Sequence, residues 1–188
     1  DLEIRGAGNL LGAEQHGHME AVGYDLYCKM LNEAVKEAKG IHTMEDFETA
    51  IDLNMDAFIP DTYISNEFQK LDIYKRIAVI ENQTDYDDML EELLDRFGEP
   101  PKAVLNLLAV AKLKALAHQA YVTEIKQTGR QVRVTLYEKA QLNPAGIPGL
   151  IQKYRRSLQF KAEQEPKFLL TWQGNILEAL TSFVQELL

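Results

Sequence analysis

Residues 101–137 read PKAVLNLLAVAKLKALAHQAYVTEIKQTGRQVRVTLY, and within them the spacing of apolar side chains changes from helical to alternating. Residues 101–119 predict a helix with a proline in its first turn. Residues 122–127 and 131–137 flank the tripeptide TGR and predict a β-hairpin with one buried face. The chain therefore combines helices with antiparallel strands. The apolar positions of the predicted helix are Val104, Leu107, Leu108, Val110, Ala111, Leu113 and Leu116.

A strand and a helix are predicted ahead of this stretch. Residues 47–53 alternate in polarity and predict a strand, and the apolar run 57–60 is expected to end in a turn. Residues 66–80 predict a helix whose N-cap is Ser65 or Asn66, because both side chains accept hydrogen bonds from free backbone N–H groups. Its expected buried face consists of Phe68, Leu71, Ile73, Tyr74, Ile77 and Ala78.

Residues 86–97 predict a further helix. We expect Thr84 or Asp85 to cap its first turn, and Gly98, followed by two prolines, to end it. The short connection to the helix at 101–119 predicts that the two helices are antiparallel neighbours. Its apolar side is expected to contain Met89, Leu90, Leu93, Leu94 and Phe97.

The other side of that helix is strongly acidic. At about 100° per residue its carboxylates share one face, although like charges three or four residues apart repel each other. A solvated face is one interpretation. A docking surface for a basic partner is the other, because complementary charge steers association. The four carboxylates are Asp88, Glu91, Glu92 and Asp95.

The rest of the chain alternates between helices and strands. We predict a helix at 143–155, strands at 158–161 and 168–172, and a closing amphipathic helix at 175–187. The order of elements indicates an α+β fold. In this fold a helical N-terminal half packs with a small, mostly antiparallel β-sheet and C-terminal helices.

Composition limits the classes of function. The 188 residues carry a net charge of −9, which argues against binding of nucleic acid by this chain, because contacts with a phosphate backbone need a basic face. Residues 121–188 nevertheless hold nine Lys/Arg against six Asp/Glu, so that the surplus of negative charge lies earlier. A single cysteine, Cys28, excludes an internal disulfide, and no apolar run is long enough to span a bilayer. We expect a cytoplasmic protein that forms part of a longer chain.

No constellation of residues points to catalysis. The glycines near the N-terminus do not match a dinucleotide loop, and a P-loop is missing from the sequence. His16 and His18 form a pair without a third ligand, and His42 and His118 are isolated. We therefore expect neither catalytic residues, nor a metal site, nor a cofactor within these 188 residues.

Two blocks of sequence resemble known families. Residues 1–18, DLEIRGAGNLLGAEQHGH, resemble the translocation motif that follows the second motor domain of RecG-like superfamily 2 DNA translocases. The segments IDLNMDAFIPDTYI, LDIYKRIA and EELLDRFGEPPKAVLNLLAVAKLKALA resemble the C-terminal domain of bacterial transcription-repair coupling factors. From residue 121 onward the resemblance depends on the order of elements alone.

The resemblance implies a domain plan and a function. Residues 1–40 would hold the translocation motif and an amphipathic helix at 24–39, and residues 41–188 the C-terminal regulatory domain. Arg5 and Gln15, with the motif glycines Gly6, Gly8 and Gly12, would couple ATP-driven motor closure to movement on DNA. His16 stands where that family usually has serine.

The resemblance also implies partners. The longer protein would be an ATP- and Mg-dependent translocase on double-stranded DNA that removes stalled RNA polymerase and recruits nucleotide excision repair. Its C-terminal domain would be autoinhibitory, docking on an N-terminal UvrB-like domain and masking the UvrA-binding surface. We expect the acidic face to make this contact, through Glu92 and Asp95 first, with Asp88 and Glu91 in support.

One alternative belongs to a different class. The basic C-terminal third could bind nucleic acid directly, although a surplus of three positive charges is small for that role. The cations concerned are Lys153, Arg155, Arg156, Lys161 and Lys167.

Overall fold

The computed structural model describes residues 47–140 and 142–188. Contacts divide these residues into two units. The first unit holds residues 54–115, and the second combines 47–53 with 116–188. The predictions for residues 1–46, among them the helix at 24–39, lie outside the described part of the chain.

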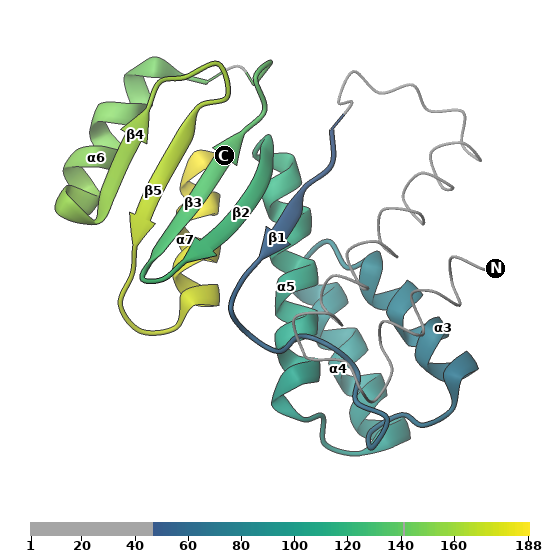
Figure 1. The fold of residues 1–188 in the computed structure, drawn as a ribbon. Helices are drawn as coiled ribbons and strands as arrows, with labels where there is room; N and C mark the ends of the chain where they lie inside the picture. The colour runs from purple at the N-terminus through teal and green to yellow at the C-terminus, as the bar shows by residue number, and fades with distance from the viewer. Residues whose placement is uncertain (1–46, 141) are drawn as a thin grey trace, which may run out of the picture. The chain divides into compact units, whose positions relative to one another are not determined.

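Three helices form most of the first unit (Figure 1): α3 (Glu67–Ala78), α4 (Gln83–Phe97) and α5 (Lys102–Gln119), whose last residues belong to the second unit. Asn66 caps α3, its side chain accepting a hydrogen bond from the Gln69 N–H. The predicted turn after Pro60 is present, with the Tyr63 and Ile64 N–H groups donating to the Pro60 carbonyl. The three helices that the sequence predicts in this region are confirmed.

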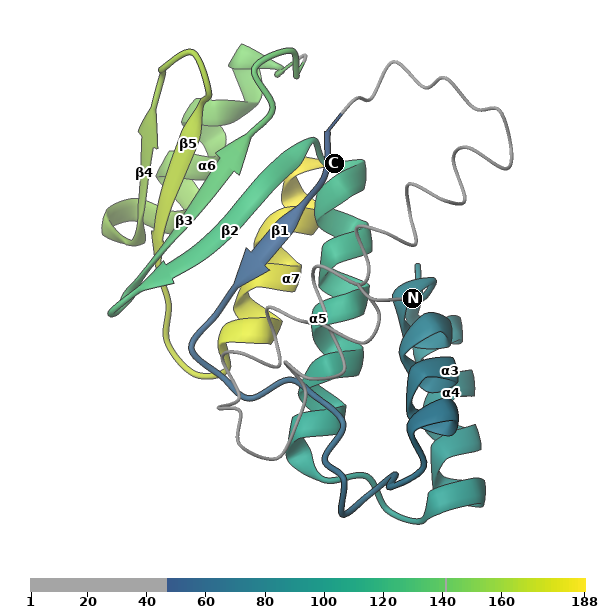
Figure 2. The same cartoon turned by 45° about the vertical axis from the view of Figure 1, so that its right-hand side comes forward.

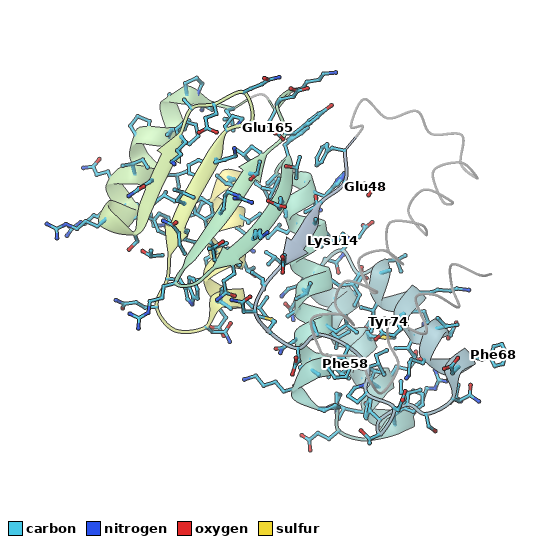
Figure 3. The ribbon with its side chains drawn as sticks, in the orientation of Figure 1. Glu48, Phe58, Phe68, Tyr74, Lys114 and Glu165 are labelled. Atoms are coloured by element: carbon cyan, nitrogen blue, oxygen red, sulfur yellow. The ribbon has the colours of Figure 1, made fainter. Side chains whose placement is uncertain are left out.

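The buried face of α3 differs from the prediction at one residue. Ile73, Tyr74 and Ile77 are buried, but Phe68 is 85% exposed and points away from the helix in Figure 3. Lys70 takes the buried position one turn before Tyr74, where it forms an ion pair with Asp61. The prediction for Phe68 was wrong because the buried stripe runs through 70, 73, 74 and 77, and position 68 lies well away from it.

The beginning of α4 also differs. The helix begins at Gln83, and its cap is Asn82, whose side chain accepts a hydrogen bond from the Asp85 N–H at 2.8 Å. The predicted caps, Thr84 and Asp85, therefore lie inside the first turn. Asp85 accepts a hydrogen bond from the Glu81 N–H, which supplies a second contact at this end. At the other end Gly98 terminates the helix with φ 84°, a conformation that favours glycine.

A five-stranded sheet forms the centre of the second unit (Figures 1 and 2). Its strands are β1 (Ala50–Asp52), β2 (Val122–Thr128), β3 (Gln131–Leu136), β4 (Leu158–Lys161) and β5 (Lys167–Thr171). Their order is β1-β2-β3-β5-β4, and only the β1–β2 pairing is parallel. Gly129 has φ 62° in the β2–β3 turn, as a tight hairpin connection requires.

Two helices of the second unit cover one face of this sheet. They are α6 (Ile147–Tyr154), which follows the 3-10 turn η1 (Pro144–Gly146), and α7 (Ile176–Leu187). A further 3-10 turn, η2 (Arg155–Ser157), leads into β4. Phe183 of α7 meets Phe168 of β5 edge-on at 5.3 Å and Tyr154 of α6 at 5.6 Å. Both views show the two helices on the same side of the sheet (Figures 1 and 2).

Alternation along the strands separates the two faces. Ile125, Val132, Val134, Phe168 and Leu170 are buried on the helix-covered face. The residues between them lie on the opposite face. The predicted α+β fold with a mostly antiparallel sheet is confirmed. In the described ranges, no helix combines the length and the apolarity that crossing a membrane requires.

Candidate docking surface

The acidic residues of α4 lie in different surroundings. Asp88, Glu91 and Asp95 are exposed, whereas Glu92 is half-buried. Met89 and Leu93 are buried on the opposite side, but Leu94, expected on the apolar side, is 46% exposed. Of the four carboxylates predicted for the docking face, three are therefore accessible, and the fourth, Glu92, is engaged within the first unit.

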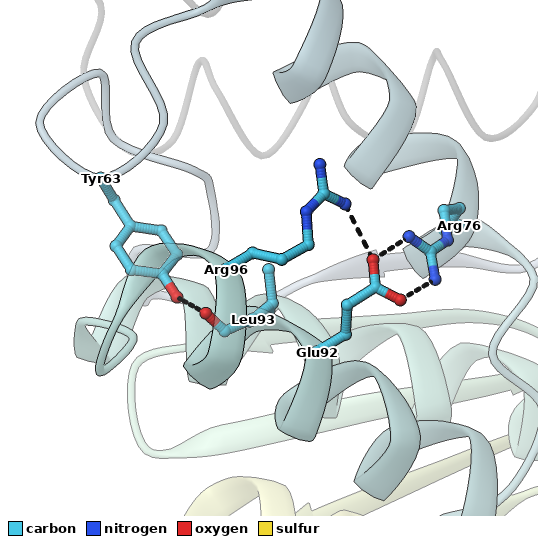
Figure 4. A network of polar contacts seen from close by, with 5 residues as sticks. All are labelled: Tyr63, Arg76, Glu92, Leu93 and Arg96. Atoms are coloured by element: carbon cyan, nitrogen blue, oxygen red, sulfur yellow. Dashed lines mark hydrogen bonds and ion pairs between the residues drawn. The ribbon is translucent and has the colours of Figure 1, made fainter.

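Glu92 is held by two arginines (Figure 4). Arg76 of α3 donates to both of its carboxylate oxygens, Nη1 to Oε2 and Nη2 to Oε1. Arg96, one turn further along α4, donates from Nη1 to Oε2 at 2.8 Å. A two-pronged guanidinium contact fixes the orientation of both groups and is stronger than a single hydrogen bond. Glu92 therefore joins α3 to α4.

The arrangement shifts the ionisation of both partners. The hydrogen bond from Arg76 is the largest cause that lowers the pKa of Glu92, and with the smaller contribution of Arg96 it outweighs the opposing effect of burial. The pKa of Glu92 falls to about 2. The same hydrogen bond raises the pKa of Arg76. Glu92 thus remains an anion at any physiological pH, with its charge compensated locally.

The C-terminal end of α4 is anchored by Tyr63, which comes from the loop before α3. Its hydroxyl donates to the Gly98 carbonyl at 2.8 Å and lies 3.2 Å from the Leu93 carbonyl. Its ring packs against Phe97 at 5.9 Å, and Arg96 lies over the Phe97 ring at 4.9 Å. Burial raises the pKa of Tyr63 above its ordinary value. These contacts hold the end of the helix that carries Glu92 and Asp95.

The charge pattern of this surface follows from these contacts. Arg76 and Arg96 are each partly exposed and lie beside Glu92. A partner approaching this side of α4 therefore meets the carboxylates of Asp88, Glu91 and Asp95 around two guanidinium groups. The surface offers both charges at defined positions, whereas the helix sequence alone indicates a uniformly acidic face.

The five cations of the alternative nucleic-acid site lie on different elements of the second unit. Lys161 and Lys167 belong to β4 and β5. Lys153 of α6 donates to Glu186 of α7 at 2.9 Å, on the helix-covered side of the sheet. Arg155 and Arg156 are exposed in η2. Only two of the five predicted cations therefore lie side by side on the sheet.

The described residues contain no group of three His, Cys, Asp or Glu side chains arranged to hold a metal ion. His118 stacks on Phe47 with ring centroids 4.5 Å apart, and its Nε2 lies 3.2 Å from the Phe47 carbonyl. Several residues named from the sequence lie outside the described residues. They are the coupling residues Arg5 and Gln15, the motif glycines, and His16, His18, Cys28 and His42.

Sequence reasoning missed Arg76 and Tyr63. Arg96 could have been paired with Glu92, because residues four apart are neighbours on a helix. Arg76 lies on another helix, 16 residues away in sequence, and Tyr63 lies 35 residues from the carbonyl that it caps. No local spacing rule connects such residues.

Comparisons with known proteins identify the family to which the sequence is similar. The TRCF domain family matches residues 53–147. The "Transcription-repair-coupling factor" of Bacillus subtilis (strain 168) is 49% identical over 141 residues, which cover 74% of this chain and 12% of that protein. The protein of the same name from Staphylococcus aureus (strain USA300) is 44% identical over 148 residues, covering 78% of this chain and 13% of the relative.

A solved structure resembles the described fold. It is titled "Crystal structure of C-terminal domain of transcription-repair coupling factor" and superimposes with a TM-score of 0.67 at 28% identity. The match covers 75% of this chain and 92% of that structure. The similarity thus extends over nearly the whole solved domain, while the chain spans about an eighth of the length of the curated relatives.

Proposed function

The chain belongs to the transcription-repair-coupling factor family, as its C-terminal domain, and we propose that it is an autoinhibitory docking module of a DNA translocase. In this proposal the domain contacts a UvrB-like domain of the same protein and masks the surface that binds UvrA. The observation that carries the proposal is the set of exposed carboxylates on α4, beside an ion-pair network that holds the helix in place.

The carboxylates have separate roles in this proposal. Asp95, Asp88 and Glu91 are exposed and would meet cations of the partner directly. Glu92 would act mainly as a positioning residue, because both of its oxygens already accept hydrogen bonds from Arg76. Contacts between exposed charges contribute more to orientation and association rate than to affinity. Such a contact suits an autoinhibitory surface that must open when a partner arrives.

The activity of the longer protein is part of the proposal. It would be an ATP- and Mg-dependent translocase on double-stranded DNA that acts on stalled RNA polymerase in the cytoplasm. The 188 residues would contribute regulation and no chemistry of their own. Arg5 and Gln15, with Gly6, Gly8 and Gly12, would couple the motor to translocation. In the full-length protein Arg5→Ala is expected to retain ATP hydrolysis and lose translocation, and translocation at the normal rate would refute that role.

A charge reversal in the full-length protein tests the docking surface. Asp88→Lys with Asp95→Lys alters two exposed side chains and leaves the contacts of Glu92 in place. If these carboxylates hold the domain closed, the variant binds UvrA about tenfold or more tightly than the parent in a titration. Unchanged UvrA binding by a correctly folded variant would refute docking through α4.

A matched control tests whether a change in net charge alone alters the affinity for UvrA. Glu165→Lys with Glu178→Lys reverses two exposed carboxylates of the second unit. This variant is expected to bind UvrA as the parent does. An equal increase in both variants would show that total charge, and not the α4 surface, sets the affinity.

A further inference from the structure

Residues 47–53 belong to the second unit, although the whole first unit separates them in sequence from the rest of it. We call this segment the strap. Its centre is β1, which pairs only with β2 and forms one edge of the described sheet (Figures 1 and 2). The chain reaches the strap from residues 1–46 and leaves it into the first unit. Neither end of the strap therefore continues directly into the rest of its own unit.

Buried side chains supplement a short strand ladder in holding the strap. The ladder joins β1 to β2 over Ala50–Asp52 alone. Parallel pairing of this kind is slightly less stable per residue than antiparallel pairing. Side chains alternate in direction along an extended segment, and every second residue of the strap is buried. The buried residues are Phe47, Thr49, Ile51 and Leu53.

Phe47 forms an aromatic latch at the start of the strap. Its ring stacks on those of His118 and Tyr137, with centroid distances of 4.5 and 4.8 Å. Its carbonyl oxygen lies 3.2 Å from His118 Nε2. Two residues further on, the Thr49 hydroxyl donates to the Val122 carbonyl at 2.6 Å. The partners of both residues thus come from the part of the second unit that follows the first unit in sequence.

The rest of the second unit has a core of its own. When β1 is left out, the antiparallel order β2-β3-β5-β4 remains. Helix α7 packs on these strands through the buried Phe183, which meets Phe168 of β5. Three or more strands with a hydrophobic face packed on a helix are enough for independent stability. Departure of the strap therefore leaves a folded sheet behind, so the strap is suited to open in a step of its own.

We propose that the strap is a releasable link. On release Phe47 leaves the rings of His118 and Tyr137, and β1 unpairs from β2 while the antiparallel strands stay folded. Along the chain Phe47 is the strap residue nearest to residues 1–46, so that movement of this preceding part acts on the latch first. Release would let the domain change its position without unfolding its sheet. The proposal concerns the second unit and is independent of docking through α4.

Hydrogen exchange of backbone amides in the 188-residue chain tests the proposal. The protected amides of the strap are expected to exchange faster than those of β3 and β5. Their exchange should also depend less on urea below the unfolding transition, because this dependence scales with the surface that opening exposes. All of them should report the same opening equilibrium, because the strap leaves as one unit.

Two matched replacements of buried phenylalanines separate release from global unfolding. Phe183→Leu weakens the packing of α7 on β5 and is expected to speed exchange in β3 and β5 about tenfold. The strap amides should be unaffected, since this packing stays intact when the strap opens. Phe47→Leu removes the ring stacking of the latch and is expected to speed exchange of the strap amides about tenfold.

Five results would overturn the proposal. They are strap amides that exchange as slowly as those of β3 with the same urea dependence, strap amides without protection, protection that declines gradually from one end of the strap, equal acceleration of strap and sheet amides by Phe183→Leu, and unchanged strap exchange in Phe47→Leu. Circular dichroism of both variants establishes that they are folded before exchange is measured.

Discussion

Arg76 of α3 donates hydrogen bonds to both carboxylate oxygens of Glu92 on α4, although the two residues lie 16 positions apart in the sequence. This contact turns a residue that the helix pattern assigns to an acidic surface into a connection between two helices. The surface available to a partner is therefore formed by the neighbours of Glu92, with two guanidinium groups among them.

Replacing Glu92 should make stability depend differently on pH. Glu92→Gln is expected to lower the free energy of unfolding by about 1 kcal/mol at pH 7, because charge-assisted bonds to Arg76 and Arg96 are lost. The pKa of Glu92 is depressed from 4.5 to about 2 in the folded chain. Its contribution is thus fully present above about pH 4.5 and disappears as the pH falls toward 2. Urea unfolding at pH 7, 4.5 and 3 measures this difference.

The control for this prediction is Asp88→Asn, which removes an exposed carboxylate of the same helix. Its unfolding free energy should differ from that of the parent by less than about 0.5 kcal/mol. A difference between the parent and Glu92→Gln that stays constant from pH 7 to pH 3 would contradict the assignment of the ion pair.

Removing one hydroxyl should loosen the end of α4. Tyr63→Phe deletes the hydrogen bonds to the Gly98 and Leu93 carbonyls while the ring keeps its packing against Phe97. We expect a loss of about 1 kcal/mol in unfolding free energy. Hydrogen exchange should be faster at the last amides of α4, with the strands of the second unit as the internal reference. Equal exchange in parent and variant would rule out a capping role.

The cap of α4 can be assigned by mutation. Asn82→Ala is expected to cost about 1 kcal/mol, because the Asp85 N–H loses its acceptor. Thr84→Ala, inside the first turn, should cost much less. Thermal unfolding of the two variants compares them directly. A larger effect at Thr84 would favour the cap that the sequence pattern predicts.

Several elements were predictable from local patterns. The hairpin at 122–136 was indicated by alternation and by the glycine in its turn. The helices were indicated by apolar spacing, by the Asn66 cap of α3 and by Gly98 at the end of α4, whereas the Asn82 cap of α4 was not predicted. The prediction for Phe68 was wrong because its neighbours on α3 supply a complete buried stripe without it. The parallel pairing of β1 with β2 was not predicted, because the two strands are about 70 residues apart in the sequence.

The sequence by itself determined the α+β class, the order of elements and the family. Apolar periodicity, helix caps and turns are set by interactions among a few neighbouring residues, and the resemblance of motifs is visible in the sequence alone. Only the tertiary structure decided that Glu92 is ion-paired with Arg76 and that Lys153 turns to Glu186. The physical reason is the same in each case. Ion pairing depends on distances of a few ångströms between side chains on separate elements, and those distances are set by packing and strand register.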